Sequence, residues 1–321
     1  MSYHPPFNIT PAIIDLIAQI SEHVGRLSAQ PRHDLRLRRI NRIRSIQGSL
    51  AIEGNTLSEQ QITAILNGKT VVAPPREIQE VKNAILAYDK MNQWQADSEA
   101  DLLQAHETLM LGLIDEYGVY RQSGVGVMKG NEVIHMAPPA GRVALLMTDL
   151  LQWVKVAEHH PLIMSSVFHY EFEFIHPFAD GNGRMGRLWQ SLILQQWNAF
   201  FADIPIENLV YQHQEDYYVA LQQSTEHSDS AHFIQFMLKR ILDAILQDTP
   251  QESPQVTPQV KLLINGIKGE MSREELQNML GLQDRKSFRE RYLKPALEAG
   301  LIEMTHPDKP NSKLQKYRRK G

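Results

Sequence analysis

The sequence contains no cysteine, and this absence excludes several kinds of site at once. Disulfide frameworks, thiolate zinc sites and cysteine nucleophiles all require the missing side chain. Chains without cysteine are compatible with a reducing compartment, so we expect a cytoplasmic location. Any chemistry must therefore come from oxygen and nitrogen side chains.

Long apolar runs and a net basic charge are missing as well. No segment approaches the roughly 20 uninterrupted apolar residues of a membrane span, so we expect no contact with a membrane. The N-terminal stretch MSYHPPFNIT lacks a charged region followed by an apolar one, which argues against a signal peptide. The formal net charge of −4 argues against a globally basic nucleic-acid binder and leaves a local basic surface open.

Most of the chain shows helical periodicity. Residues 1–95 are predicted to form an N-terminal helical region, in which a helix over residues 34–55 carries apolar residues on one face and arginines on the other. Helical patterns continue through residues 96–247, the predicted core. Alternating apolar residues from Val125 to Ile134 flank Lys129-Gly-Asn131, which predicts a short β-hairpin. The sequence thus predicts an all-α fold interrupted by one hairpin.

A second domain is expected beyond residues 248–258, a proline- and glutamine-rich stretch that predicts an exposed linker. Residues 259–321 contain three helical segments, a strand near Leu301–Thr305 and a basic tail, an order similar to that of winged-helix DNA-binding domains. The cations expected to meet DNA are Lys286, Arg289, Arg291, Lys309, Lys313, Lys316, Arg318, Arg319 and Lys320. A winged helix that binds protein and carries a solvated tail is the alternative.

The stretch HPFADGNGRMGR, residues 176–187, combines the features of an anion site. Pro177 ends the apolar helix before it, and glycines in the turn Asp180–Gly183 are free to take positive φ angles. The amides of such a turn and of the helix that follows converge on one point. Arg184 and Arg187 lie three residues apart, so both guanidiniums project from the same side. The pattern predicts a polyphosphate site.

The same stretch contains groups suited to catalysis. Asp180 offers a hard carboxylate beside the phosphates, which is how proteins usually hold Mg²⁺. Histidine titrates near neutrality, so His176 suits the role of general base for a hydroxyl. A glycine-rich turn between core helices is the structural alternative, and it would be favoured for any one residue alone. The combination within twelve residues favours an enzyme.

The stretch resembles the Fic family motif HPFx(D/E)GNGRxxR at every defined position, and the resemblance extends over about residues 30–247. It implies a Fic-type helical core that transfers AMP from ATP to a Ser, Thr or Tyr hydroxyl of a target protein or of the chain itself. It implies that His176 is the base, that Asp180 holds Mg²⁺ and that Phe178 anchors the loop. The residues implied in ATP binding are Asp180, Gly181, Asn182, Gly183, Arg184, Gly186 and Arg187.

A second stretch, Ser49-Leu-Ala-Ile-Glu-Gly-Asn55, resembles the inhibitory motif (S/T)xxxE(G/N) of Fic proteins that carry it N-terminal to the core, the class II type. The resemblance implies that Glu53 pairs with Arg187 and blocks the γ-phosphate. Ser49 and Glu53 are i and i+4 on one helix face, and a carboxylate competes with phosphate for a guanidinium. A solvent-exposed glutamate before a helix-ending glycine is the alternative.

Two further similarities concern the hairpin and the adenine. The hairpin resembles the family's flap, whose strand edge could pair with an extended target, although a hairpin that only shields the site is an equal alternative. The flap residues expected near ATP are Val125, Gly126, Val127 and Met128. Tyr217 matches a tyrosine near the adenine in similar proteins, whereas Thr225 stands where many have an asparagine.

Three functions remain open. The first is AMP transfer restrained by Glu53, and the second is removal of AMP or transfer of another nucleotide or phosphate-containing group. The third is a transcriptional regulator whose core senses a nucleotide without turnover. His176 favours an enzyme, because sensing requires no base. Relatives often form dimers, so a homodimer is expected.

Overall fold

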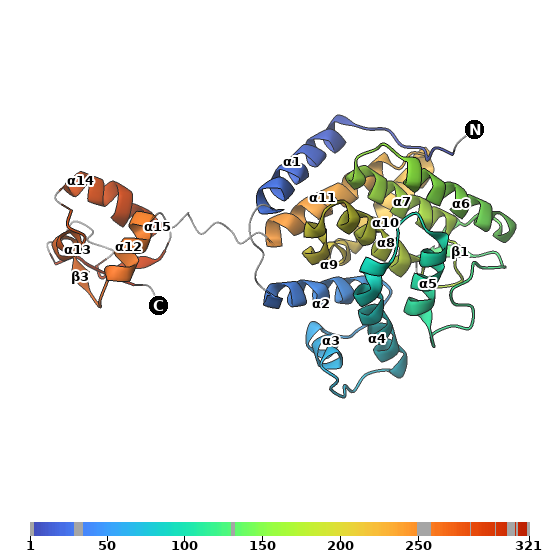
Figure 1. The fold of residues 1–321 in the computed structure, drawn as a ribbon, viewed down its shortest axis with the longest axis horizontal. Coiled ribbons are helices and arrows are strands. Elements are labelled where there is room, and N and C mark those ends of the chain that lie inside the picture. The colour runs from blue at the N-terminus through green and yellow to red at the C-terminus, as the bar shows by residue number, and fades with distance from the viewer. Residues whose placement is uncertain are drawn as a thin grey trace. The chain divides into compact units, whose positions relative to one another are not determined.

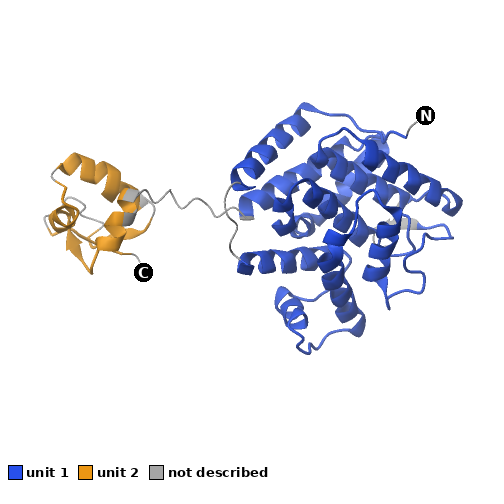
Figure 2. Ribbon diagram, in the orientation of Figure 1, with its two compact units in different colours: residues 1–248 blue, residues 249–321 orange. Residues whose placement is uncertain are grey.

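The computed structural model describes residues 3–28, 35–129, 132–248, 258–282, 284–298, 300–306, 312 and 314–319. The chain forms two compact units, Met1–Asp248 and Thr249–Gly321 (Figure 2). Some sequence predictions fall outside the described residues: those on Asp34, the hairpin turn Gly130–Asn131, linker residues 249–257, Lys309, Lys313 and Lys320. The two predicted regions 1–95 and 96–247 both belong to the first unit.

Helices dominate the first unit (Figure 1). They are α1 Pro11–Ser28, α2 Leu35–Ile52, α3 Glu59–Leu66, α4 Pro75–Lys90, α5 Glu99–Met110, α6 Ala140–Val156, α7 Pro161–Ile175, α8 Asn182–Trp197, α9 Ile206–Gln212, α10 Gln214–His227 and α11 Ala231–Asp248. Strands β1 Gly126–Lys129 and β2 Glu132–Met136 form an antiparallel hairpin between α5 and α6. The predicted helical fold with a hairpin is confirmed. Within the described chain, no helix has the length and apolar character to cross a bilayer.

Helices α7 and α8 lie at the centre of the first unit (Figure 1). Both are buried over most of their length, and α7 contacts α8, α6 and α11. A helix that is apolar on nearly all sides requires such a central place. The loop between the two helices is therefore fixed by the core at both ends.

The second half of α2 is held against α9 by close packing. At Gly48 an added Cβ would lie 2.6 Å from Cα and N of Asn208, so only glycine allows this approach. Helix α9 is short, covering only residues 206–212. Short helices have weak periodicity, and burial of Leu209 and Val210 stabilises this one.

The second unit combines helices with a small antiparallel sheet. Its elements are α12 Pro258–Gly266, β3 Met271–Ser272, α13 Arg273–Met279, α14 Arg285–Phe288, a π-helical turn η3 Arg289–Leu293, α15 Lys294–Glu298, β4 Ile302–Met304 and β5 Lys316–Arg319. The strand order is β3-β5-β4. The strand predicted near Leu301 is confirmed by β4, whereas residues 316–319, predicted as a basic tail, form β5. Tyr317 explains that difference, because its buried side chain fixes the strand to the core of this unit.

Candidate active site

His176 ends α7 in a left-handed backbone conformation, with φ 50° and ψ 62°. This region is uncommon for residues other than glycine, so the surrounding structure must hold His176 in place. Its Nδ1 lies 3.4 Å from the carbonyl oxygen of Glu173 and 3.9 Å from that residue's carboxylate. Burial lowers the pKa of His176, although Glu173 acts in the opposite direction. The imidazole is therefore neutral at neutral pH.

Arg121, which no sequence pattern indicated, supports this backbone. Its side chain is 1% exposed, and burial lowers its pKa. The guanidinium donates to the carbonyl of His176 at 2.7 Å, to that of Ser123 at 2.8 Å and to that of Pro138 at 2.6 Å. Its amide donates to Pro177. Arg121 thus ties both ends of the hairpin segment to the start of the loop.

His106, on α5, supports the middle of the loop and was also missed. Its Nδ1 accepts a hydrogen bond from the amide of Gly118 at 2.9 Å, so its proton lies on Nε2 and is donated to the Asp180 carbonyl at 3.0 Å. Burial lowers the pKa of His106 to about 4, which keeps the ring neutral. The ring stacks on Phe178 with centroids 3.6 Å apart. Phe178 is fully buried, so its predicted anchoring role is confirmed.

Asn182 braces the loop with both ends of its side-chain amide. Its Oδ1 accepts from the amide of Phe178 and its Nδ2 donates to the same residue's carbonyl, each at 2.9 Å. Gly181, just before it, has φ 84°, a conformation that glycine adopts without strain. Among the described residues, no side chain caps the first turn of α8. Its amides therefore stay available to an anion.

Asp180 and Arg184 form one side of the site. The Asp180 carboxylate accepts from the amide of Gly181 at 2.6 Å and from Arg184 at 3.0 Å, and its second oxygen lies 3.3 Å from Arg76. Arg184 is buried and lies 3.7 Å from Glu80, whereas the Asp180 side chain is 42% exposed. Within the described chain, no group of three or more His, Asp and Glu side chains is arranged to hold a metal. Asp180 is thus an accessible carboxylate that is paired with two arginines.

The Arg187 side chain is bound by Ser49, on α2, and by Glu53, the residue that follows this helix. It donates to the Ser49 hydroxyl at 3.1 Å, to the Ser49 carbonyl at 2.9 Å and to the Glu53 carboxylate at 2.7 Å. Burial alone would lower the pKa of Arg187, but Glu53 raises it. A Cβ on Gly183 would overlap with the Glu53 carboxylate. Glycine at this position lets Glu53 lie directly against the start of α8.

The remaining residues predicted to contact ATP are Gly186, Tyr217 and the flap residues. Gly186 faces His169 and Glu173 where α7 crosses α8. Tyr217 is 2% exposed, and its hydroxyl lies 3.2 Å from Nε2 of His169, so both rings belong to the core. The Thr225 hydroxyl lies 3.2 Å from that of Tyr170. Of the flap residues Val125, Gly126, Val127 and Met128, the structure describes the side chain of the half-buried Val125 and only the backbone of the others.

Comparisons with known proteins agree with this geometry. Residues 96–194 match the Fic/DOC family. Residues 258–319 match the family described as filamentation induced by cAMP protein Fic-like, C-terminal domain. The first match contains the whole loop from His176 to Arg187, whereas α2 with Ser49 and Glu53 lies outside it.

Relatives extend the similarity to the rest of the chain. A protein of Culex quinquefasciatus named Protein adenylyltransferase Fic is 33% identical over 221 residues, which cover 64% of this chain and 41% of the mosquito protein. The fold is shared with Fic-1 of C. elegans, which is 24% identical with a TM-score of 0.60 and covers 74% of this chain and 70% of that one. The crystal structure of a Fic family protein from Desulfovibrio desulfuricans G20 is 52% identical, covers 99% of both chains and has a TM-score of 0.76. The chain belongs to the Fic family.

Proposed function

We propose that the chain is a protein adenylyltransferase, which transfers AMP from ATP to a Ser, Thr or Tyr hydroxyl of a target protein or of itself. One observation carries this proposal: the imidazole of His176 is held at the end of a braced loop whose other end is an uncapped helix start. A base beside an anion site is what hydroxyl attack on a phosphate requires. The name of the mosquito relative supports the same activity.

In this mechanism His176 removes the proton of the attacking hydroxyl. Its Nδ1 faces the Glu173 carbonyl, which leaves Nε2 to accept the proton. The hydroxyl oxygen bonds to the α-phosphorus, the bond from that phosphorus to the bridging oxygen breaks, and pyrophosphate leaves. The amides at the start of α8 and the guanidinium of Arg184 would stabilise the developing negative charge.

Magnesium fits the accessible carboxylate of Asp180. Mg²⁺ is usually held by one or two carboxylates together with substrate phosphates and water, so a cage built from protein alone is not needed. The half-exposed side chain of Asp180 would hold it, and when bound the ion would neutralise charge on the ATP phosphates. Arg76 would then exchange its contact with Asp180 for one with a phosphate oxygen.

We also propose that Glu53 restrains the enzyme. Arg187 is the second guanidinium near the start of α8, and Ser49 and Glu53 together engage it. A bound γ-phosphate would compete with the Glu53 carboxylate for the same donors. Removal of Glu53 should therefore free Arg187 for ATP, while Ser49 keeps the guanidinium oriented.

We also propose a cytoplasmic location and two kinds of partner. The chain has no cysteine, which suits the cytoplasm. A homodimer and contact of residues 259–321 with DNA are also proposed, the latter through a winged-helix-like second unit. Removal of AMP would use the same His176 base and is the second candidate activity. A nucleotide-sensing regulator is less well supported, because sensing alone does not need a base with a lowered pKa.

The direct test measures which phosphate of ATP becomes attached to protein. Wild type, Glu53→Gly and the double variant Glu53→Gly, His176→Ala are incubated with Mg²⁺ and ATP labelled at the α- or γ-phosphorus. We expect α-label on Glu53→Gly, about 5- to 150-fold faster than on wild type, as a coupling of about 1–3 kcal/mol would give. The double variant should remain unlabelled.

Different failures separate the two proposals. Attachment of γ-label, or equal α-label on the double variant, would exclude AMP transfer by His176. Equal labelling of wild type and Glu53→Gly would contradict the proposed restraint by Glu53, but it would not contradict the proposed AMP transfer. Glu53→Gln is the matched control: it keeps the size of the side chain but loses the charge, so we expect an intermediate rate.

A further inference from the structure

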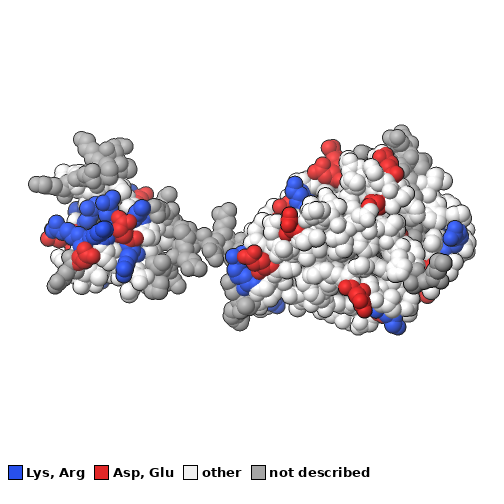
Figure 3. Space-filling view, turned by 90° about the horizontal axis from the view of Figure 1, so that it is seen from above, with Lys and Arg blue, Asp and Glu red and all other residues white. Residues whose placement is uncertain are grey.

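Positive charge is concentrated in the second unit. Residues 258–321 contain 14 Lys and Arg against 8 Asp and Glu, a formal charge of +6, whereas the whole chain carries −4. On the face of this unit seen in Figure 3, Lys and Arg side chains gather into one group with a few acidic side chains beside them. Such local concentration of one sign marks a surface for a polyanion.

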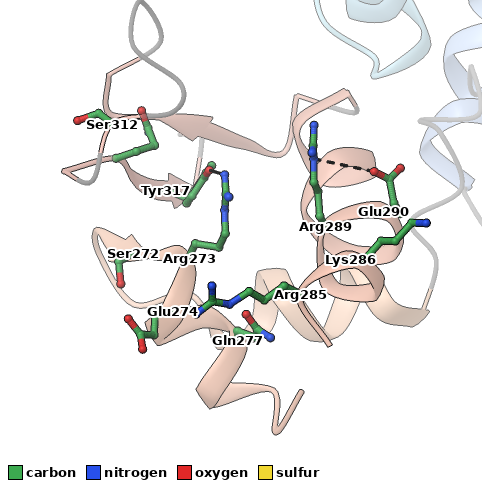
Figure 4. Close-up of a pocket in the computed structure, with 11 residues that line it drawn as sticks. Ser272, Arg273, Glu274, Gln277, Arg285, Lys286, Arg289, Glu290, Ser312 and Tyr317 are labelled. Carbon is green, nitrogen blue, oxygen red and sulfur yellow. Dashed lines mark hydrogen bonds and ion pairs between the residues drawn. The ribbon is translucent and has the colours of Figure 1, made fainter. Parts of the chain in front are cut away.

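A cleft of about 840 Å³ lies among these charges, between α13, the α14–η3 stretch and the residues around β5 (Figure 4). Four cations line it: Arg273, Arg285, Lys286 and Arg289. Two acidic residues, Glu274 and Glu290, also line it, and the one ion pair between lining residues joins Arg289 to its neighbour Glu290 at 3.9 Å. Within the described chain, neither Arg285 nor Lys286 has a carboxylate at ion-pair distance. The cleft is therefore cationic.

Individual side chains are arranged for contact from several sides. Arg273 is positioned by a hydrogen bond of 3.2 Å to the hydroxyl of Tyr317. Arg285 and Arg289 both line the cleft from the α14–η3 stretch, and the Arg285 side chain extends toward Gln277 (Figure 4). Gln277 and Ser312 add neutral hydrogen-bonding groups to the walls. Cationic and neutral donors from several walls of the cleft can all contact phosphate oxygens.

The lining is poorly suited to two classes of ligand, apolar small molecules and single-stranded nucleic acids. None of its eleven residues is aliphatic, whereas pockets for drug-sized molecules are mostly apolar. Its only aromatic residue, Tyr317, is 1% exposed and presents no face on which a base could stack. Single-stranded nucleic acids are bound largely by such stacking. Among nucleic acids, the phosphate backbone of a duplex therefore fits the lining better than a single strand does.

We infer that this cleft binds the sugar-phosphate backbone of duplex DNA. Arg285, Lys286 and Arg289 contact phosphates from the helical stretch, and Arg273 contacts them from α13. The contacts are electrostatic, so affinity falls with salt and depends little on sequence. This inference rests on the DNA contact proposed above for residues 259–321 and assigns it to a site. It does not depend on AMP transfer, because every residue that carries it lies in the second unit.

The test uses the full-length protein and the fluorescence anisotropy of a labelled duplex of about 30 base pairs, from about 50 to 200 mM salt. The cleft variant Arg285→Gln, Arg289→Gln is compared with a charge-matched control, Lys268→Gln, Lys294→Gln. Lys268 and Lys294 are exposed in the same unit but do not line the cleft. We expect the slope of log affinity against log salt to fall by about two for the cleft variant and to change little for the control.

Three results would overturn the inference. They are no duplex binding by wild type at the lowest salt, equal losses in the cleft variant and its control, or tighter binding of a single strand of the same sequence. Circular dichroism checks that each variant is folded. If the glutamine variant unfolds, Arg285→Lys, Arg289→Lys keeps the charge and should retain the wild-type salt slope, whereas a changed slope would also contradict the proposed contacts.

Discussion

At the scale of single residues, the burial of His176 determines the pH range of the proposed reaction. Burial and Arg121 lower the pKa of His176, whereas Glu173 and Glu53 raise it. Burial is the largest of these effects, and the pKa is lowered overall. The neutral form is the base, so the rate should stay level as pH falls to the ordinary histidine pKa of about 6.5 and decrease only below it. The Glu53→Gly variant loses a carboxylate that favours protonation, so its midpoint should lie no higher.

The measurement is the rate of α-label transfer by Glu53→Gly at saturating ATP and Mg²⁺, so that titration of free ATP has little influence. A half-maximal rate at pH 6.5 or above would show that the base is solvated, contrary to the burial of His176. Replacement of Glu173 by Gln gives a second check. It removes a charge that favours the protonated imidazole, so the midpoint should move further down.

The same scale shows what the sequence could reveal about the site. The pairing of Glu53 with Arg187 was implied by the resemblance of both stretches to family motifs, and the two side chains are in contact. Arg121 and His106 belong to no such pattern, and both act on backbone carbonyls that folding brings together. Arg121 lies 55 residues from His176 in sequence, and its partners could be any peptide group. Contacts of this kind leave no periodic signal.

At the scale of elements, the contact between α2 and α9 positions Ser49 and Glu53. Gly48→Ala would force a Cβ to within 2.6 Å of the Asn208 backbone, so the helices must separate. Overpacking of this kind costs about 1–3 kcal/mol. The free energy of unfolding, measured by urea titration, should therefore be lower than that of wild type by this amount. The displaced end of α2 should also loosen the Glu53 contact with Arg187 and raise α-label transfer.

Gly25→Ala on α1 is the matched control, because an added Cβ there meets nothing within 4 Å. Alanine is a better helix former than glycine, so the free energy of unfolding of this variant should rise by about 0.4–1 kcal/mol. Its rate of α-label transfer should equal that of wild type. Equal unfolding midpoints for the two variants would contradict the tight packing of α2 on α9.

Long, periodic elements were predictable, and short ones depended on tertiary contacts. Helices such as α7 and α11 have repeated apolar positions that define them before folding. Strand β5 carries three basic residues and one tyrosine, and only the burial of Tyr317 between β3 and β4 makes it a strand. Helix α9 has seven residues and depends in the same way on α2 and α11. Propensity is a weak guide where packing decides.

At the scale of the whole molecule, the proposed chemistry and the proposed DNA contact belong to different compact units. His176, Asp180, Arg187 and Glu53 all lie in Met1–Asp248, and the cationic cleft lies in Thr249–Gly321. The second unit has its own core, which includes Leu263, Leu276, Phe288 and Tyr317. Separate cores allow each unit to fold without the other.

We therefore expect the Glu53→Gly variant of residues 1–248 to transfer AMP at a rate within about twofold of the full-length variant, since the proposed catalytic residues and the core that holds them all belong to the first unit. Self-modification is not a suitable readout, because the shortened enzyme lacks any modified hydroxyl that lies in the second unit. The substrate should instead be full-length protein that carries His176→Ala, added in trans to both enzymes. The shortened enzyme should also lose duplex binding. Loss of AMP transfer by a shortened enzyme that still unfolds cooperatively would mean that the second unit contributes to the reaction, contrary to the division described here.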